Sequence, residues 1–326
     1  MSRTGMNPAR TKHSTYRPAR VTVAVLVHIP NLTGFYEHRL EVLKACLDSI
    51  LQNTNGSYDL LVFDNASCIE VQAYIGGLQD EGLVTFVYRS AVNVGKLAAL
   101  RLITDAAPGE LIAFSDDDVY HYPGWLEAEL EVHDNFPNVG VVSGYVTPSM
   151  FVEERTQSAR AFARSESEAV LTEGDVVPSS MTVSWATSIS LDPERELKEQ
   201  AELDQYLIEY RGVKALAAAH HDQFLSSPMV MDRCLPKTWD GRLMGGMVQL
   251  DQEIDRTGYL RLTTSEQHTQ NLGNRFVEQD LVLSQGVRVG LPRTNTTLVR
   301  RLLKSRPVRF VLLGIYSRLF HLVHPE

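Results

Sequence analysis

The sequence predicts an α/β protein with a central, mostly parallel sheet that is flanked by helices and followed by a helical C-terminal extension. Between residues 21 and 146, short apolar runs rich in β-branched residues alternate with segments whose apolar residues recur at helical spacing. This alternation is typical of βαβ units in a parallel sheet. With 326 residues, 44% of them hydrophobic, the chain is also long enough to bury a large core.

The individual elements of this first part follow from the same patterns. The run VTVAVLV at residues 21–27 is apolar throughout, as in a buried strand, and residues 38–52 carry apolar side chains at helical spacing. By these criteria further strands are expected at residues 59–63, 83–88, 111–115 and 139–146, and further helices at residues 69–79, 96–107 and 125–135.

The second half of the chain is less regular. Residues 148–190 show no clean period, and residues 194–211 have the pattern of a highly charged helix. Residues 243–262 indicate a glycine turn, a short helix with carboxylates, a turn at Gly258 and a strand.

Charge divides the chain into a middle and two ends. The net charge is −9, yet residues 1–20 and 281–325 carry arginines and lysines without any acid. We expect a disordered basic segment at 1–20, two halves of one domain at 21–146 and 147–280, and a basic amphipathic extension at 281–326. A nucleic-acid-binding protein usually concentrates positive charge on its folded face, so nucleic acid is not an expected partner.

The cysteines and the N-terminus indicate the compartment. Cys46, Cys68 and Cys234 are far apart and have no CxxC spacing, which argues against a disulfide framework and a zinc site. The N-terminal residues lack the apolar stretch of a signal peptide. Both features favour a cytoplasmic location.

Polar segments follow each of the first four expected strands. Ligands of open α/β sheets bind beyond the carboxyl ends of the strands, so these segments are expected to share one site. They are His28–Asn31, Asp64–Ser67, Arg89–Lys96 and Asp116–Asp118.

The last of these segments is an unusual run of three carboxylates after the apolar stretch LIAFS. Adjacent carboxylates repel one another unless a cation lies between them, and their oxygens suit Mg²⁺ or Mn²⁺. Residues i and i+2 of an extended segment point the same way, so Asp116 and Asp118 are expected to converge on one metal–nucleotide complex while Asp117 points elsewhere. The alternative is an acidic turn or a helix cap.

Taken together, DNAS after the second strand, NVG before an alanine-rich helix, and FSDDDVYHYPGW resemble the motifs of the family 2 glycosyltransferases, which have the GT-A fold. Order and spacing agree over about residues 21–146, and less clearly to residue 275. The resemblance implies a metal-dependent, inverting enzyme that moves a hexose-like sugar from a nucleoside diphosphate sugar, with UDP favoured, to a hydroxyl acceptor such as a glycan or a lipid-linked glycan.

The resemblance also implies roles for single residues. Asp64 would accept the ring N–H of a uracil-like base, Asp116 would lie toward the ribose or the metal, and Asp118 would bind Mn²⁺ or Mg²⁺ directly. Singly, Asp64 also fits a turn residue that satisfies its own backbone, and Asn93 fits a cap. The donor-binding residues implied are His28, Pro30, Asp64, Asn65, Asn93, Gly95, Asp116 and Asp117.

The catalytic base is harder to place, because the family's E-D pair at the start of a helix is not present as such. Counting back from the GY of LDQEIDRTGY leads to Met247, and one helical turn further on lies Asp251. We expect Asp251 to be the base, with Glu253 and Asp255 as rivals. The alternative is that all three belong to a solvated helix face.

Two further histidine segments are candidates for the site. The family often adds a downstream histidine as a third metal ligand, and SEQHTQNLGN offers His268, with Asn271 as the alternative. The pair His220 and His221 is expected to border the acceptor.

The C-terminal segment mixes arginines with apolar residues. Its apolar run after Arg309 is far shorter than the ~20 residues that a membrane span needs. It is expected either to lie on the inner face of a membrane as a basic amphipathic helix or to pack on the catalytic domain or in a homodimer interface.

Two other functions stay open from the sequence. A nucleotidylyltransferase also combines an α/β sheet with a carboxylate-held metal, although HIPNLTGFYEHR has too few glycines for a loop that cradles a triphosphate. A binding module that kept the fold but lost the base is the other alternative.

Overall fold

The computed structural model describes residues 15–238 and 245–276. Its strands are β1 (Val21–Val27), β2 (Asp59–Asn65), β3 (Phe86–Ser90), β4 (Leu111–Asp116), β5 (Val119–His121), β6 (Val139–Ser143), β7 (Ala169–Gly174), β8 (Gln205–Tyr210), β9 (Val213–Leu216), β10 (Gln223–Ser226), β11 (Leu260–Thr264) and β12 (Thr269–Asn271). Its α-helices are α1 (Arg39–Asn53), α2 (Ile69–Asp80), α3 (Lys96–Ala106), α4 (Trp125–Asn135), α5 (Gln157–Ser165), α6 (Ser179–Ser188), α7 (Pro193–Gln200), α8 (Pro228–Cys234) and α9 (Gly245–Arg256).

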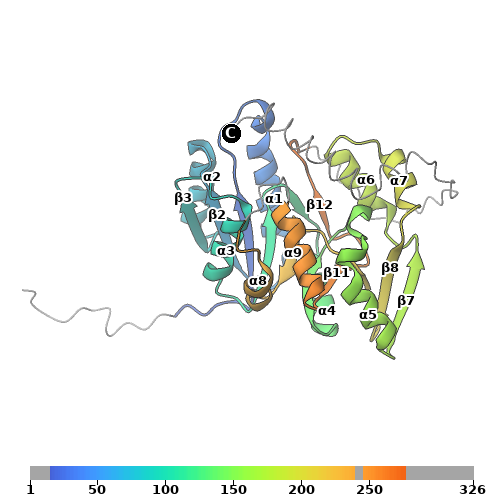
Figure 1. The fold of residues 1–326 in the computed structure, drawn as a ribbon. Helices are drawn as coiled ribbons and strands as arrows, with labels where there is room; N and C mark the ends of the chain where they lie inside the picture. The colour runs from blue at the N-terminus through green and yellow to red at the C-terminus, as the bar shows by residue number, and fades with distance from the viewer. Residues whose placement is uncertain (1–14, 239–244, 277–326) are drawn as a thin grey trace, which may run out of the picture.

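Ten of the described strands form one mixed sheet in the order β3-β2-β1-β4-β10-β6-β11-β9-β8-β7, and β12 and β5 form a separate pair. Strands β3, β2, β1 and β4 are parallel neighbours, whereas β10 runs antiparallel to both β4 and β6. Figure 1 shows β2 and β3 toward one end of this sheet and β7 and β8 at the other. The predicted α/β class is confirmed: the half with β1 is parallel throughout, and in the other half β11 pairs parallel with β6.

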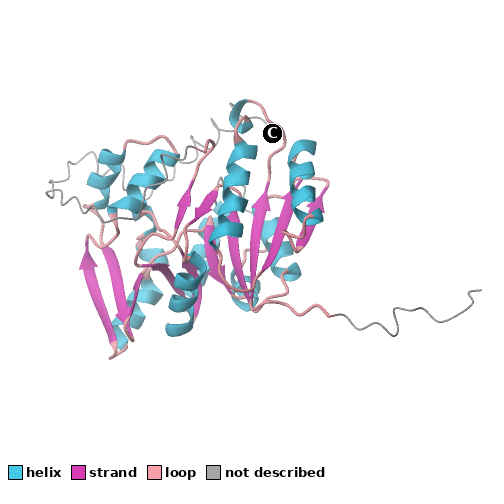
Figure 2. Ribbon diagram, turned by 180° about the vertical axis from the view of Figure 1, so that it is seen from behind, coloured by secondary structure: helices cyan, strands magenta, loops and turns pink. Residues whose placement is uncertain are grey.

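Alternation along the strands divides the core between the two faces of the sheet. In β1, Val23 and Val25 pack with residues of α1 and α2, whereas Ala24 and Leu26 pack with residues of α3, α8 and α9. Helices therefore cover both faces, as the views from the front and from behind show (Figures 1 and 2). A parallel sheet needs this double cover because both of its faces are apolar.

Both halves of the chain contribute to the same sheet. Strand β10 comes from the second half and lies between β4 and β6 of the first half. Its residues Gln223 and Leu225 pair with Ser115 and Ala113 of β4. This insertion brings the loop before β10 to the carboxyl end of β4.

Most elements of the first half confirm the predicted ones, and α9, the turn at Gly258 and β11 confirm the elements predicted within residues 243–262. The rest of the second half differs from its prediction. Residues 194–211 are not one helix: α7 ends at Gln200 and β8 begins at Gln205. Along β8, buried and partly buried side chains alternate over most of the stretch QYLIEY, which is a strand pattern. The charged residues that precede it obscure this pattern in the sequence. Residues 148–190 contain α5, β7 and α6, and the short strand β5 after the carboxylates was not predicted.

The ends of the chain fall only partly within the described residues. Residues 15–20, expected to be disordered, lie along the sheet because the Asp59 carboxylate accepts hydrogen bonds from the Tyr16 hydroxyl and the Ala19 amide, each at 2.9 Å. The basic extension at 281–326, with its predicted membrane or dimer contact, lies outside the described residues. No helix in the described part of the chain combines the length and apolarity needed to span a bilayer.

Candidate functional site

The carboxyl ends of β1, β2, β3 and β4 meet at one edge of the sheet, as predicted. In the strand register, Asp64 lies beside Val27 on one side and Arg89 on the other, and Asp116 lies beside Leu26. The polar segments after these strands are therefore neighbours in space.

Three residues of this edge, each following a different strand, form one hydrogen-bonded network. The Asn65 side-chain amide donates to Asn93 Oδ1 at 3.0 Å, and the Asn93 amide lies 3.1 Å from His28 Nε2. His28 Nδ1 lies 2.7 Å from the Asn65 carbonyl oxygen. The structure therefore brings together His28, Asn65 and Asn93, which the sequence only places after separate strands.

Asn65 and Asn93 also hold the start of α3. The amides of Val94 and Gly95 donate to Asn65 Oδ1 and Asn93 Oδ1 at 2.9 and 2.8 Å. Gly95 has φ +78°, a backbone conformation that disfavours other residues. Pro30, in contrast, is exposed in the loop after β1.

Replacing Asn65 with alanine is expected to lower the free energy of unfolding by about 1–3 kcal/mol, because the substitution removes two hydrogen bonds, one from the partly buried Val94 amide and one to Asn93. Urea denaturation measures the change. The matched control is Asn135→Ala, since that side chain bonds only Glu131 of its own helix on the surface, and it should stay within about 0.5 kcal/mol of the wild type. Equal losses in both variants would contradict a structural role for the network.

Asp64 lies on the opposite face of the sheet edge from Asn65, since neighbouring residues of a strand alternate. Its side chain is completely buried, its Oδ1 accepts a hydrogen bond from the Ser67 amide at 2.9 Å, and Arg89 Nε lies 3.1 Å from Oδ2. Asp64 is thus a turn residue, as the alternative interpretation had it, and is also paired with a cation that is itself 45% exposed.

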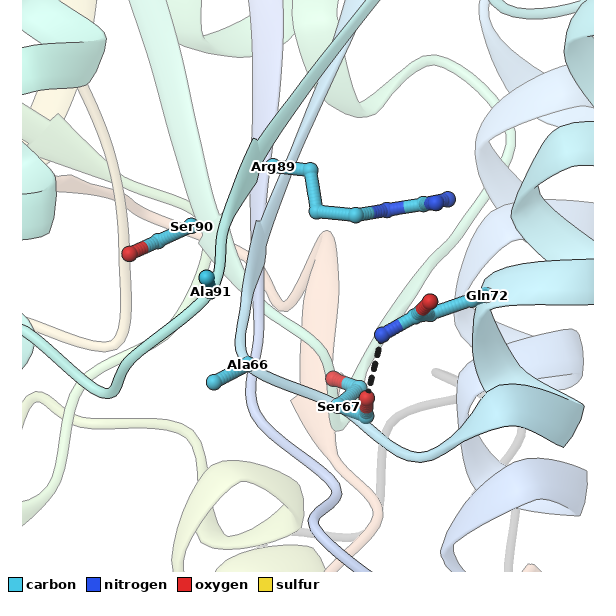
Figure 3. A pocket seen from close by; sticks show the side chains of 6 residues that line it. All are labelled: Ala66, Ser67, Gln72, Arg89, Ser90 and Ala91. Carbon is cyan, nitrogen blue, oxygen red and sulfur yellow. Dashed lines mark hydrogen bonds between the residues drawn. The ribbon is translucent and has the colours of Figure 1, made fainter.

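Arg89 lines a pocket of about 490 Å³ at this corner. Figure 3 shows Arg89 and Gln72 extending into the space between the strand ends and α2, where the Gln72 amide donates to the Ser67 carbonyl oxygen at 2.6 Å. The pocket is lined by Ala66, Ser67, Gln72, Arg89, Ser90 and Ala91. Its volume lies within the range of small-molecule sites.

Each of the three adjacent carboxylates forms an ion pair with a cation of the protein. Asp116 pairs with Lys96, and Asp117 pairs with Arg39. Arg39 Nη1 also donates to Asp118 Oδ2 at 2.9 Å. The predicted divergence of Asp117 from its neighbours is wrong in this respect: Asp117 and Asp118 share one guanidinium, because β4 ends at Asp116 and a turn follows.

Burial affects the ionisation of two of these carboxylates, Asp116 and Asp117. It raises the pKa of Asp116 to about 7, although the nearby Lys96 ammonium acts in the opposite direction. Burial likewise raises the pKa of Asp117, against the effect of Arg39. A further cation beside Asp116 and Asp117 would favour their charged forms.

Arg39 is a site residue that sequence reasoning missed. It is buried, and besides the two carboxylates it donates to the Gly273 carbonyl oxygen at 2.9 Å. It thereby joins α1, the carboxylate turn and the segment after β12. A single arginine at the start of an amphipathic helix carries no signal for this role, since its partners lie far away in the sequence.

Asn271, rather than His268, lies close to the carboxylates. In the β5–β12 pair Asn271 is opposite Val119, and the next residue, Leu272, donates its amide to the Asp118 carbonyl oxygen at 2.7 Å. His268 precedes Asn271 by three residues, which corresponds to about 10 Å along a strand. Its Nδ1 lies 3.0 Å from the Glu266 carbonyl oxygen.

Asp251 lies in a buried ion-pair cluster. Its Oδ1 is 2.9 Å from Arg261 Nη2, and its Oδ2 is 3.1 Å from His221 Nδ1 and 3.5 Å from Arg155 Nη1. Burial by itself would raise its pKa, but the Arg261 charge and these other partners lower it to about 2. Asp251 is therefore an ionised carboxylate in the core.

The two rivals of Asp251 are also bound to the protein. Glu253 forms a surface pair with Arg256, at 2.6 Å. Asp255 Oδ1 accepts hydrogen bonds from the amide and hydroxyl of Ser158, at 3.0 and 2.7 Å. None of the three carboxylates contacts the Asp116–Asp118 triplet through any hydrogen bond or ion pair found among the described residues.

The carboxylate oxygens at this edge suit a hard divalent cation whose other ligands would come from the substrate. Asp118 offers carboxylate oxygens on a side chain that is 20% exposed. No cluster of three or more His, Cys, Asp or Glu side chains in the described part of the chain has the arrangement of a protein-only metal centre. Mg²⁺ is usually bound by one or two carboxylates together with substrate phosphates, and this donor set meets that requirement.

Comparison with known families supports the resemblance of the motifs. The sequence model described as "Glycosyl transferase family 2" matches residues 35–188, which include the helices and strands from α1 to α6. Residues 35–188 are similar to glycosyl transferase family 2. The matched segment contains Arg39, Asp64, Asn65, Asn93, Lys96 and the Asp116–Asp118 triplet, whereas His28 and Asn271 lie outside it.

Solved structures with local similarity include S. aureus TarS 1–349, with 15% identity and a TM-score of 0.30 over 38% of this chain and 35% of that one. Another is the mannosyltransferase PcManGT from Pyrobaculum calidifontis in complex with GDP-Man and Mn²⁺, with 24% identity and a TM-score of 0.35 over 45% and 41%. This chain thus spans less than half the length of those structures. No curated protein matches it.

Proposed function

We propose that this protein is a metal-dependent, inverting glycosyltransferase that moves a hexose-like sugar from a nucleoside diphosphate sugar to a hydroxyl acceptor, such as a glycan or a lipid-linked glycan. The observation that carries this proposal is the junction of the His28–Asn65–Asn93 network with the three carboxylates at one sheet edge. There the His28 amide lies 3.4 Å from Asp117 Oδ2. The family of residues 35–188 supports the same reaction class.

The pocket beside Arg89 suits the nucleobase. Its volume can accept a heterocycle, and Arg89 in its lining offers a donor for a base edge. Asp64, fully buried and paired with Arg89, would accept a ring N–H only if Arg89 moved away from it. A carboxylate that accepts a ring N–H favours uracil, which is why we prefer UDP as the donor nucleotide.

The other end of the edge suits the diphosphate. Lys96 and Arg39 place two positive charges beside the carboxylates, and Asp118, with the diphosphate, would hold Mn²⁺ or Mg²⁺. Such an ion neutralises charge that develops on a leaving diphosphate. The protein's own cations act in the same sense, since Lys96 lies at the start of α3 where the helix dipole also favours an anion.

Nucleoside diphosphates are expected to stabilise the protein when Mn²⁺ is present. Thermal unfolding is measured with UDP, GDP and dTDP, each with and without Mn²⁺. A nucleotide at about 100 times its Kd raises the stability by about 2.7 kcal/mol, which shifts Tm by several degrees. We expect the largest shift with UDP plus Mn²⁺. No shift with any nucleotide would contradict the proposed function.

A non-catalytic sugar-nucleotide-binding module is the second candidate, because Asp251, Glu253 and Asp255 are all bound to other protein groups. Release of UDP from a UDP-sugar discriminates the two functions. A module would show the metal-dependent thermal shift without any release, whereas an enzyme would show both.

A further inference from the structure

A histidine and an aspartate in the loop between β9 and β10 form a dyad beside the carboxylate triplet. His220 Nδ1 lies 2.5 Å from Asp222 Oδ1, and the Tyr145 hydroxyl donates to Asp222 Oδ2. The His220 ring stacks with Tyr145, at 4.8 Å between ring centroids, and with His221, at 5.1 Å. The two ring contacts thus hold the plane of the imidazole, and the contact with Asp222 fixes the direction of Nδ1.

The dyad is attached to the candidate site through Asp222. The Asp116 amide donates to the Asp222 carbonyl oxygen at 2.7 Å, and the Asn271 side-chain amide lies 3.4 Å from Asp222 Oδ2. Asn271 in turn precedes Leu272, whose amide binds Asp118. Asp222 is therefore linked to Asp116 directly and to Asp118 through Asn271 and Leu272.

The surroundings of Asp222 favour its charged form. Burial by itself would raise its pKa, but the His220 charge, the hydrogen bonds from His220 and Tyr145, and the Lys96 charge together lower the pKa well below its usual range. An ionised carboxylate at Nδ1 requires a proton on that nitrogen, which leaves the lone pair of a neutral imidazole on Nε2. Nε2 of His220 is not fully buried and has no hydrogen-bond partner among the described residues.

No carboxylate of α9 is equally placed. Asp251 is held by Arg261, Arg155 and His221 in the core, and freeing it would leave buried positive charge uncompensated. The chain therefore needs a proton acceptor from another element.

We propose that His220 is the general base of the transfer, with Asp222 and Tyr145 as positioning residues; this inference rests on the proposed function. The acceptor oxygen bonds to the anomeric carbon while the bond from that carbon to the diphosphate oxygen breaks. The electron pair of that bond leaves on the diphosphate, and the hydroxyl proton passes to Nε2 of His220 and later to solvent. Asp222 stabilises the imidazolium that forms.

Turnover is expected to depend on the protonation of His220. The titratable or charged groups that face it are Tyr145 after β6, His221 and Asp222 in its own loop, and Lys96 of α3 through its charge on Asp222. Since only the neutral imidazole can accept a proton, activity is expected to fall at acid pH.

His220→Gln is expected to lower turnover about 10²-fold, since a general base contributes at least this factor. The readout is UDP or GDP released from UDP- and GDP-sugars with water as the acceptor, from about pH 5 to pH 9. The activity of this variant should no longer fall at acid pH, and its thermal shift with UDP plus Mn²⁺ should be unchanged. Added imidazole should restore activity to a second variant, His220→Gly. Asp222→Asn should lower turnover and change the acid limb.

The control is His133→Gln, since His133 lies on α4 beside Asp134 and away from the site; it should leave turnover and the thermal shift unchanged. Unchanged turnover in His220→Gln, or loss of its thermal shift with UDP plus Mn²⁺, would overturn the role of His220 as the base and would leave the proposed function standing. Absence of that shift in the wild-type protein would overturn the proposed function, and the inference with it.

Discussion

Asp118→Ala is expected to abolish the metal-dependent thermal shift with UDP and to lower turnover about 10³-fold. The variant removes the carboxylate that we expect to hold the divalent cation, and a lost charge-stabilising group in an active site costs on the order of 10²–10³ in rate. Arg39 keeps its pair with Asp117, so the fold should be retained. Thermal shift and nucleotide release, each with and without Mn²⁺, measure both effects.

Asp80→Ala is the matched control for this variant. Asp80 is exposed at the end of α2, so its removal takes away the same charge without touching the strand ends. It should bind UDP and Mn²⁺ like the wild type. If Asp118→Ala still showed a full Mn²⁺-dependent shift, Asp116–Asp118 would be an acidic turn rather than a donor–metal site.

Asp251→Asn is expected to lower the free energy of unfolding by about 3–5 kcal/mol. The substitution leaves the fully buried Arg261 without its carboxylate at 2.9 Å, and removing one partner of a buried ion pair has a cost of this size. The midpoint of urea denaturation measures the loss. Glu253→Gln on the same helix is the control, because its surface pair with Arg256 contributes less than about 1 kcal/mol.

The same pair predicts the pH dependence of stability. The pKa of Asp251 is lowered to about 2 in the folded protein, below its ordinary value. Its contribution is therefore fully present above about pH 4 and is lost as the pH falls toward 2. The wild type should lose stability in this window by about 2 kcal/mol more than Asp251→Asn does. Unchanged stability together with lost turnover in Asp251→Asn would instead show that Asp251 is the base.

The residues that could be predicted are those that follow strands of the parallel half. The runs at β1, β2 and β4 are apolar enough to be recognised, and in parallel strands the next residues necessarily reach the same edge. His28, Asn65 and Asn93 were therefore placed in one site, and the structure joins them by hydrogen bonds.

The partners of those residues could not be predicted in the same way. Arg39 meets Asp118 across 79 residues of sequence, and Tyr145 meets Asp222 across 77. No local pattern shows that an arginine of α1 turns inward to two carboxylates. The carboxylates of α9 have the spacing of a solvated face, yet two of them, Asp251 and Asp255, are buried.

The sequence by itself determined the α/β class, the parallel order of the first strands and the edge at which the polar segments gather. Those features follow from periodicity that can be recognised within about 11–18 residues, and from the geometry that parallel strands share. Only the tertiary structure decided which charges meet. The insertion of β10 between β4 and β6 brings the His220–Asp222 dyad beside the triplet. Asp251 lies in the core with Arg261, because a buried charge is stable only where a partner of opposite charge neutralises it.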